Sequence, residues 1–203
     1  MSEQKMNDRL EKFSYALGLS IASNLIQSGV KTIDPSSFIR ALEDLFTGKE
    51  PNMSADEANR ILQEFMEEQQ SGEAGSNLEA GLKFLSENLN DEKVVETASG
   101  LQYKILVHGD GESPSLTDEV KCHYHGTLID GTVFDSSVQR GTPAVFPVNG
   151  VIQGWVEALQ MMPVGSKWRL FVPSDLAYGE RGAGGSIGPN TTLIFDVELL
   201  EIV

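Results

Sequence analysis

The sequence predicts an α+β protein in which an all-α N-terminal half precedes an antiparallel β-sheet with one short helix. Apolar residues recur every three or four positions up to about residue 93 and at every second position after it. These are the repeats of an amphipathic helix and of a half-buried strand. Glycine also becomes more frequent after this point. The length of 203 residues is enough for two small domains.

A first helix is expected from residue 10 to Gly29, because glycine adopts a left-handed C-cap at little cost. A second should follow Asp34 and Pro35, an N-cap residue and a proline suited to the first helical position. Gly48 should end it. The two apolar stripes comprise Leu10, Phe13, Leu17, Ile21 and Leu25, then Phe38, Ile39, Leu42, Leu45 and Phe46.

A third helix should begin at Ser54, which forms a capping-box pattern with Glu57. Helical spacing continues to Met66 and resumes from Leu78 to Leu89. Between them lie glycines at 72 and 75, each of which disfavours a helix by about 1 kcal/mol relative to alanine. The segment 67–93 is therefore either one long connecting helix or two helices with a hinge.

The apolar stripes of these helices need a partner. A bundle of about 60 residues is marginal alone, so pairing with a second copy of the chain is the favoured interpretation. The alternative is that the stripes pack on one another or on the β half.

The β half should contain five strands and one short helix. The helix is expected at 154–160, between Gly150 and Pro163. Turn signals such as Asp130-Gly131 join the strands. The predicted strands are Leu101 to His108, Glu119 to Leu128, Thr132 to Ser136, Lys167 to Val172 and Leu193 to Ile202.

Composition argues against several classes of function. With 15 basic and 30 acidic residues the formal net charge is −15, which repels nucleic acid and anionic lipid. The single cysteine, Cys122, excludes an internal disulfide framework. The N-terminal segment has no apolar signal-peptide core, and the apolar runs are far too short to span a bilayer. A cytoplasmic protein without membrane insertion is expected.

Covalent and metal-assisted chemistry are not favoured either. His123 and His125 would share a strand face, but no third ligand is near them in sequence and Cys122 would face the other way. No GxSxG, HExxH or CxxC pattern occurs, and the glycines after Gly182 lack the context of a phosphate-binding loop. We therefore expect no metal and no cofactor.

Aromatic and branched residues gather at the joints of the predicted strands. They are either the domain core or the lining of a concave apolar site, in which Asp135 and Tyr178 would supply polar groups. The set comprises Tyr124, Phe134, Val151, Ile152, Trp155, Phe171, Tyr178, Ile187 and Phe195.

Four segments extend this pattern: CHYHGTLIDGTVFDSS (122–137), PVNGVIQGWVEAL (147–159), MPVGSKWRLFVPSDLAYGERG (162–182) and TLIFDVELLEI (192–202). Together they resemble the FKBP family of peptidyl-prolyl cis/trans isomerases over residues 94–203. With its N-terminal helices, the whole chain is similar to the Mip-like bacterial branch. In that branch the helices of two chains interlock into a V-shaped homodimer.

The resemblance implies a helical dimerisation domain (1–66), a connecting helix (67–93) and an isomerase domain (94–203) in which a twisted antiparallel sheet wraps around one short helix. It implies non-covalent rotation of Xaa-Pro bonds in folding polypeptides, without a cofactor, and macrolides as inhibitors. The alternative function is a dimeric holdase whose helical cleft binds unfolded chains.

The resemblance also assigns roles within the pocket. Trp155 would be the floor, and Asp135 a buried polar group facing the twisted amide, held by Tyr124 and Arg140. The N–H of Ile152 and the hydroxyl of Tyr178 would bind substrate carbonyls. Phe134, Phe195, Val151 and Ile187 would complete the lining. Ala144 and the loop 183–186 depart from the family pattern, which leaves substrate preference and macrolide affinity open.

Overall fold

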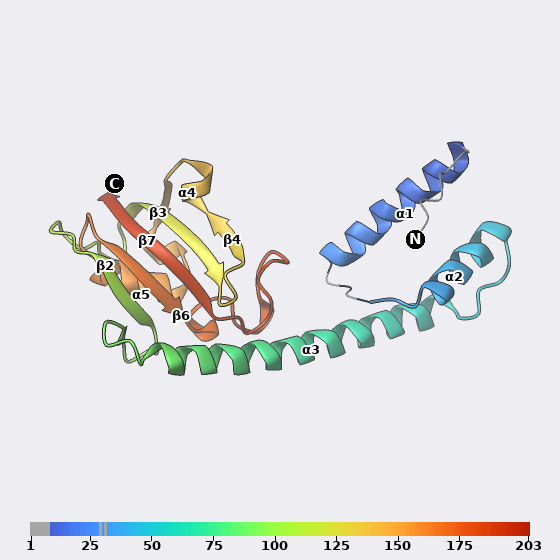
Figure 1. Cartoon of the computed structure of the whole chain (residues 1–203), viewed down its shortest axis with the longest axis horizontal. Coiled ribbons are helices and arrows are strands. Elements are labelled where there is room, and N and C mark those ends of the chain that lie inside the picture. Colours follow the sequence, from blue (N-terminus) through green and yellow to red (C-terminus); the bar gives the residue numbers. More distant parts are fainter. Residues whose placement is uncertain (1–8, 29, 31) are drawn as a thin grey trace, which may run out of the picture. The chain divides into compact units, whose positions relative to one another are not determined.

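The computed structural model describes residues 9–28, 30 and 32–203, apart from the side chain of Gln69 (Figure 1). The chain forms two compact units, residues 1–64 and 65–203. This division differs from the predicted boundaries at 66/67 and 93/94. The expected fold class, helices followed by an antiparallel sheet, is confirmed.

The first unit contains α1 (Arg9–Gln27), α2 (Pro35–Thr47) and the start of α3 (Ala55–Asn88). The caps of α2 are as predicted. The Asp34 carboxylate accepts hydrogen bonds from the N–H groups of Ser36 at 2.9 Å and Ser37 at 3.1 Å, and Gly48 is left-handed with φ 72°. Gly29, the predicted end of the first helix, lies outside the described residues.

Helix α3 is continuous from Ala55 to Asn88, so of the two alternatives for the connecting segment the structure has the single long helix, without a hinge at Gly72 and Gly75. The N–H of Glu57 donates to Ser54 Oγ at 3.2 Å, which is one half of the expected capping box. Propensity is overridden because the later part of α3 packs on the sheet. Phe84 lies 5.9 Å from Phe171 between ring centroids, and the 67–93 segment lies entirely within the second, β-rich unit.

The second unit is built on a seven-stranded antiparallel sheet (Figure 1). Its order is β1-β2-β6-β7-β3-β4, and β5 pairs with β3. The bounds of β3, β6 and β7 are those predicted, whereas β1, β5 and the short α4 (Ser137–Arg140) were not predicted. The strands are β1 (Val95–Glu96), β2 (Gln102–Val107), β3 (Glu119–Leu128), β4 (Val133–Ser136), β5 (Ala144–Pro147), β6 (Lys167–Val172) and β7 (Leu193–Ile202).

Helix α5 (Gln153–Met161) supplies the centre of the core. It buries one face, made of Gly154, Trp155, Ala158 and Leu159. A methyl group on Gly154 would lie 2.6 Å from Val172 Cγ1, so only glycine lets the helix approach the sheet this closely. Three short 3₁₀ turns connect the other elements: η1 (Val148–Gly150), η2 (Ser174–Leu176) and η3 (Gly179–Arg181).

Cys122 is fully buried in this core, and its burial raises the pKa of the thiol to about 12. His123 Nδ1 lies 3.1 Å from Ser137 Oγ, and His125 Nδ1 lies 2.9 Å from Ser136 Oγ. The described residues contain no cluster of three or more His, Cys, Asp or Glu that could hold a metal ion. Nor does any described helix combine the length and the apolar character needed to cross a membrane.

Candidate active site

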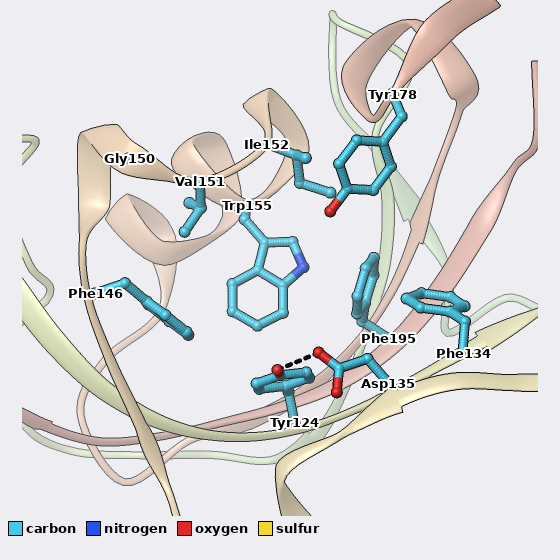
Figure 2. Close-up of a pocket in the computed structure, with 10 residues that line it drawn as sticks. All are labelled: Tyr124, Phe134, Asp135, Phe146, Gly150, Val151, Ile152, Trp155, Tyr178 and Phe195. Carbon is cyan, nitrogen blue, oxygen red and sulfur yellow. Dashed lines mark hydrogen bonds between the residues drawn. The ribbon is translucent and has the colours of Figure 1, made fainter. Parts of the chain in front are cut away.

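A cavity of about 440 Å³ opens beside the N-terminal end of α5 (Figure 2). Strands β3, β4, β5 and β7 supply part of its wall, and η1, α5 and the segment between η2 and η3 supply the rest. The lining comprises Tyr124, Phe134, Asp135, Phe146, Gly150, Val151, Ile152, Trp155, Tyr178 and Phe195.

Trp155 stands at the centre of the cavity, 4% exposed. Three rings meet it nearly at right angles, with centroid distances of 5.5 Å to Tyr124, 5.6 Å to Phe146 and 5.2 Å to Phe195. Figure 2 shows the indole nitrogen on the side of the ring that faces Phe195 and Tyr178. This buried N–H has no hydrogen-bond acceptor among the described residues. The result is a rigid, almost wholly apolar floor.

One wall depends on a glycine in β3. Phe134 and Phe195 form an edge-to-face pair with centroids 5.4 Å apart, a favourable geometry for aromatic rings. A methyl group on Gly126 would lie 2.7 Å from Phe134 Cζ and 3.0 Å from Phe195 Cε1. The absence of a side chain at Gly126 therefore allows both rings to line the cavity.

The polar side of the cavity is a hydrogen-bonded group of three side chains. The Tyr124 hydroxyl donates to Asp135 Oδ2 at 2.5 Å. The Arg140 guanidinium donates to Asp135 Oδ1 and, at 2.8 Å, to the Tyr124 hydroxyl. Its Cζ also lies 5.6 Å from the centre of the Tyr124 ring. The carboxylate is thus held from two directions and presents a fixed negative charge beside the apolar floor.

These contacts set the protonation states. Burial acts to raise the pKa of Asp135, but the hydrogen bonds from Tyr124 and Arg140 and the charge of Arg140 outweigh it, and the net pKa lies below the usual 3.8. Burial, with the hydrogen bond to Asp135, raises the pKa of Tyr124 above its usual 10. Asp135 is therefore charged and Tyr124 neutral at physiological pH.

Turnover should consequently be almost independent of pH between about 5 and 9. Because the folded-state pKa of Asp135 is lowered, its charged form is fully present above the usual 3.8 and is lost only as the pH falls through the lower value. Isomerisation rates of one proline peptide, measured in a constant-ionic-strength buffer series, would check this. A fall in turnover centred near neutral pH would contradict the assignment, because it would require a different titrating group.

Two further groups at the rim can bind a ligand. Ile152 is the N-cap residue of α5, and its N–H donates to no acceptor among the described residues. Tyr178 is 41% exposed, and its ring leans over the cavity from the segment between η2 and η3 (Figure 2). An N–H group and a hydroxyl are suited to bind carbonyl oxygens of an extended peptide.

The structure brings eight of the ten predicted site residues together around the cavity. Arg140 is not a lining residue, but it contacts two of them. Ile187 is placed elsewhere: it is 8% exposed and packs in the core. Its backbone forms an isolated antiparallel bridge with Ala183. Asp135, expected to be buried, has a side chain 43% exposed, because it opens onto the cavity.

Phe146 and Gly150 also line the cavity and were not predicted. Phe146 lies in β5, which was not predicted, and Gly150 lies in η1, which follows that strand. Alternate residues of β5 are half-buried, so Ala144 and Phe146 share a face, and this alternation was the available signal. Gly150 lies against Pro147, whose Cγ would be 2.8 Å from a methyl group there.

Comparison with known proteins shows the family to which the chain belongs. Residues 110–200 match the family described as FKBP-type peptidyl-prolyl cis-trans isomerase, and residues 10–105 match the domain amino-terminal to it. The chain is 50% identical to the FKBP-type 22 kDa peptidyl-prolyl cis-trans isomerase of Escherichia coli over 94% of each chain. It is 45% identical to the peptidyl-prolyl cis-trans isomerase Mip of Coxiella burnetii over 95% of this chain and 86% of that one.

The whole fold is also similar to a solved structure. The crystal structure of FkpA from Escherichia coli matches 98% of both chains with a TM-score of 0.70 and 34% identity. The chain therefore belongs to the FKBP-type peptidyl-prolyl cis-trans isomerases. It catalyses the cis-trans isomerisation of peptidyl-prolyl bonds.

Proposed function

We propose that the proline ring of a polypeptide substrate enters the 440 Å³ cavity and rests on Trp155. The main observation in favour of this proposal is the arrangement of three aromatic rings nearly perpendicular to the buried Trp155 indole. A saturated five-membered ring can pack against these aromatic side chains because it is apolar and has no group that needs a hydrogen bond. The Ile152 N–H and the Tyr178 hydroxyl would hold the chain on either side of the proline by its carbonyl groups.

Rotation then requires no nucleophile. The barrier of about 18–20 kcal/mol comes from amide resonance, and hydration of the carbonyl favours the planar, more polar form. An apolar cavity removes that water, and a fixed carboxylate can stabilise the charge distribution of the twisted amide more than that of the planar one. Asp135, held by Tyr124 and Arg140, is placed for this differential interaction.

Binding of a short peptide with a central Leu-Pro bond tests the location of the site. In ¹H–¹⁵N NMR spectra of the full chain, we expect the largest shifts at the Trp155 indole N–H and the Ile152 amide. Exchange cross-peaks between the cis and trans peptide signals should appear at the same time. A control peptide with alanine in place of proline should produce neither. Shifts confined to residues outside the cavity would contradict the proposed site.

We also propose that the chain forms a homodimer through its first unit. No described residue of α1 or α2 is buried within one chain. Large apolar side chains are exposed instead, including Phe46 at 85%, Ile26 at 70% and Leu10 at 67%. A unit of this size needs more buried apolar surface to be stable, and a second copy offers matching stripes.

Light scattering should therefore give about twice the chain mass of 22.1 kDa. The dimer should tighten as salt is added, since the net charge of −15 on each chain is screened while the apolar contact is not. A monomer at micromolar concentration in both low and high salt would contradict the dimer and leave the isomerase activity untouched. The cytoplasmic location stays a prediction, which cell fractionation would test.

A holdase activity is the second candidate, favoured by the same exposed apolar residues. If the helices carry it, an Asp135→Ala variant should still suppress aggregation of an unfolded client that has no slow proline step. Loss of suppression in that variant would contradict this second function.

A further inference from the structure

The segment that follows Tyr178 in the chain is hydrogen-bonded to helix α3. Asn77 Nδ2 donates to the Pro189 carbonyl at 2.8 Å and to Thr191 Oγ1 at 3.3 Å. Asn190 Nδ2 donates in return to the Ala74 carbonyl at 3.5 Å. The turn at 189–191 is thus attached to a helix more than 110 residues earlier in the sequence, within the second compact unit.

Two glycines make this close approach of helix and turn possible. A methyl group on Gly81 of α3 would overlap Thr192 Oγ1 and lie 3.2 Å from Thr192 Cβ. A methyl group on Gly188 would lie 3.0 Å from Asn77 Nδ2. The helix and the turn therefore pack closely against each other, and Asn77 and Asn190 both supply hydrogen bonds between them.

The 189–191 turn is hydrogen-bonded to the residue that follows Tyr178, a lining residue of the cavity. The Asn190 N–H donates to the Gly179 carbonyl at 2.8 Å, and Gly179 follows Tyr178. Asn190 has φ 53°, the only positive φ at a non-glycine residue in the described part of the chain. Asparagine tolerates this left-handed conformation better than other non-glycine residues do, and neighbouring contacts stabilise it further. The Asn77 contacts on either side of Asn190 are of this kind.

Tyr178 itself has little else to fix it. Among the described residues its hydroxyl makes no hydrogen bond, and 41% of the residue is exposed. Its position over the cavity therefore depends on the backbone at 178–179, where the Gly179 carbonyl accepts from the Asn190 N–H at 2.8 Å and from the Gly182 N–H at 3.4 Å.

We propose that Asn77 is a positioning residue for isomerisation, which acts through the 189–191 turn to hold Tyr178 at the rim of the cavity. The inference rests on the proposed role of the Tyr178 hydroxyl as a ligand for a substrate carbonyl. It makes the later part of α3 a component of the catalytic unit as well as a connection between the two units.

The first test replaces Asn77 with alanine in the full chain. We expect kcat/KM for a Leu-Pro peptide to fall about threefold to tenfold. Most of the fall should lie in KM, because an anchor is displaced while Asp135 and Trp155 stay in place. The matched control is Ser76→Ala, an exposed neighbour on the same helix turn, which should keep wild-type values. Wild-type kcat/KM in Asn77→Ala would overturn the proposal.

A double-mutant cycle separates positioning from general destabilisation. In a Tyr178→Phe background the hydroxyl is already absent, so adding Asn77→Ala should lower kcat/KM by less than about twofold further. Full additivity of the two losses would overturn the proposal. Wild-type turnover in Tyr178→Phe alone would instead remove the role of Tyr178 in substrate binding, and the proposal with it.

A second pair of variants tests the same junction without touching a hydrogen-bonding side chain. Both Gly81→Ala and Gly75→Ala raise helix propensity, but only the first meets an obstacle, since nothing lies within 4 Å of a methyl group at Gly75. Gly81→Ala should raise KM as Asn77→Ala does and should shift the Gly179 and Asn190 amide resonances. Gly75→Ala should change neither. Equal KM values for the two variants would contradict the proposal that the contact between α3 and the 189–191 turn positions Tyr178.

Discussion

Replacing Asp135 with alanine should lower kcat/KM for a Leu-Pro peptide about 10- to 100-fold, the range expected for losing a hydrogen-bonded charge. The substitution removes the acceptor for both Tyr124 and Arg140 and the only carboxylate that lines the cavity among the described residues. Because the side chain is 43% exposed, the unfolding free energy should change by no more than about 1 kcal/mol.

The matched control for this variant is Asp110→Ala, which removes an exposed carboxylate outside the cavity lining. It should leave kcat/KM unchanged. Protease-coupled or NMR exchange assays would measure turnover, and circular dichroism would verify the fold. If both variants turned over peptide at the wild-type rate, Asp135 would have no part in stabilising the twisted amide.

The second large effect concerns Trp155. Trp155→Ala should lower the unfolding free energy by about 3–5 kcal/mol, the range for truncating a large core aromatic, and should abolish measurable turnover. The chain offers a matched control in Trp168, which is also 4% exposed but stacks on Tyr103 at 4.4 Å, outside the cavity. Trp168→Ala should lose similar stability and keep its turnover per folded molecule.

Urea unfolding and peptide isomerisation at low temperature, measured on both variants, separate the two effects. Dividing the isomerisation rate by the folded fraction of each variant isolates the contribution of the Trp155 indole to catalysis. Equal residual activity in Trp155→Ala and Trp168→Ala would show that the indole at 155 matters only for stability.

Local pattern was sufficient for much of this fold. The Asp34-Pro35 cap and the long strands β3, β6 and β7 obey short-range rules of propensity and alternation. Strand β5 was not predicted, because it has only four residues and ends in proline. Its pairing with β3, and not a pattern in its own sequence, makes this segment a strand. The continuity of α3 through Gly72 and Gly75 was likewise undecidable from propensity, because tertiary packing of its later turns stabilises it.

The site divides in the same way. Tyr124, Asp135 and Trp155, which the family motifs indicated, all line the cavity, and each lies on a regular element. Ile187 packs in the core and is not among the residues that line the cavity. It lies in a glycine-rich loop whose sequence has no alternation to indicate which side chains face the cavity. The contacts of Asn77 could not be predicted, because they join segments more than 110 residues apart and an asparagine on a helix carries no pattern of its own.

The burial of Cys122 has a practical consequence for spectroscopy. The protein's single thiol is inaccessible and almost fully protonated at neutral pH, and only the thiolate reacts with maleimide or methanethiosulfonate labels. A cysteine introduced on the surface, for example at exposed Ser186, would therefore be the only site to take up a probe. Fluorescent or spin labels could follow the loop during turnover without removal of the native cysteine.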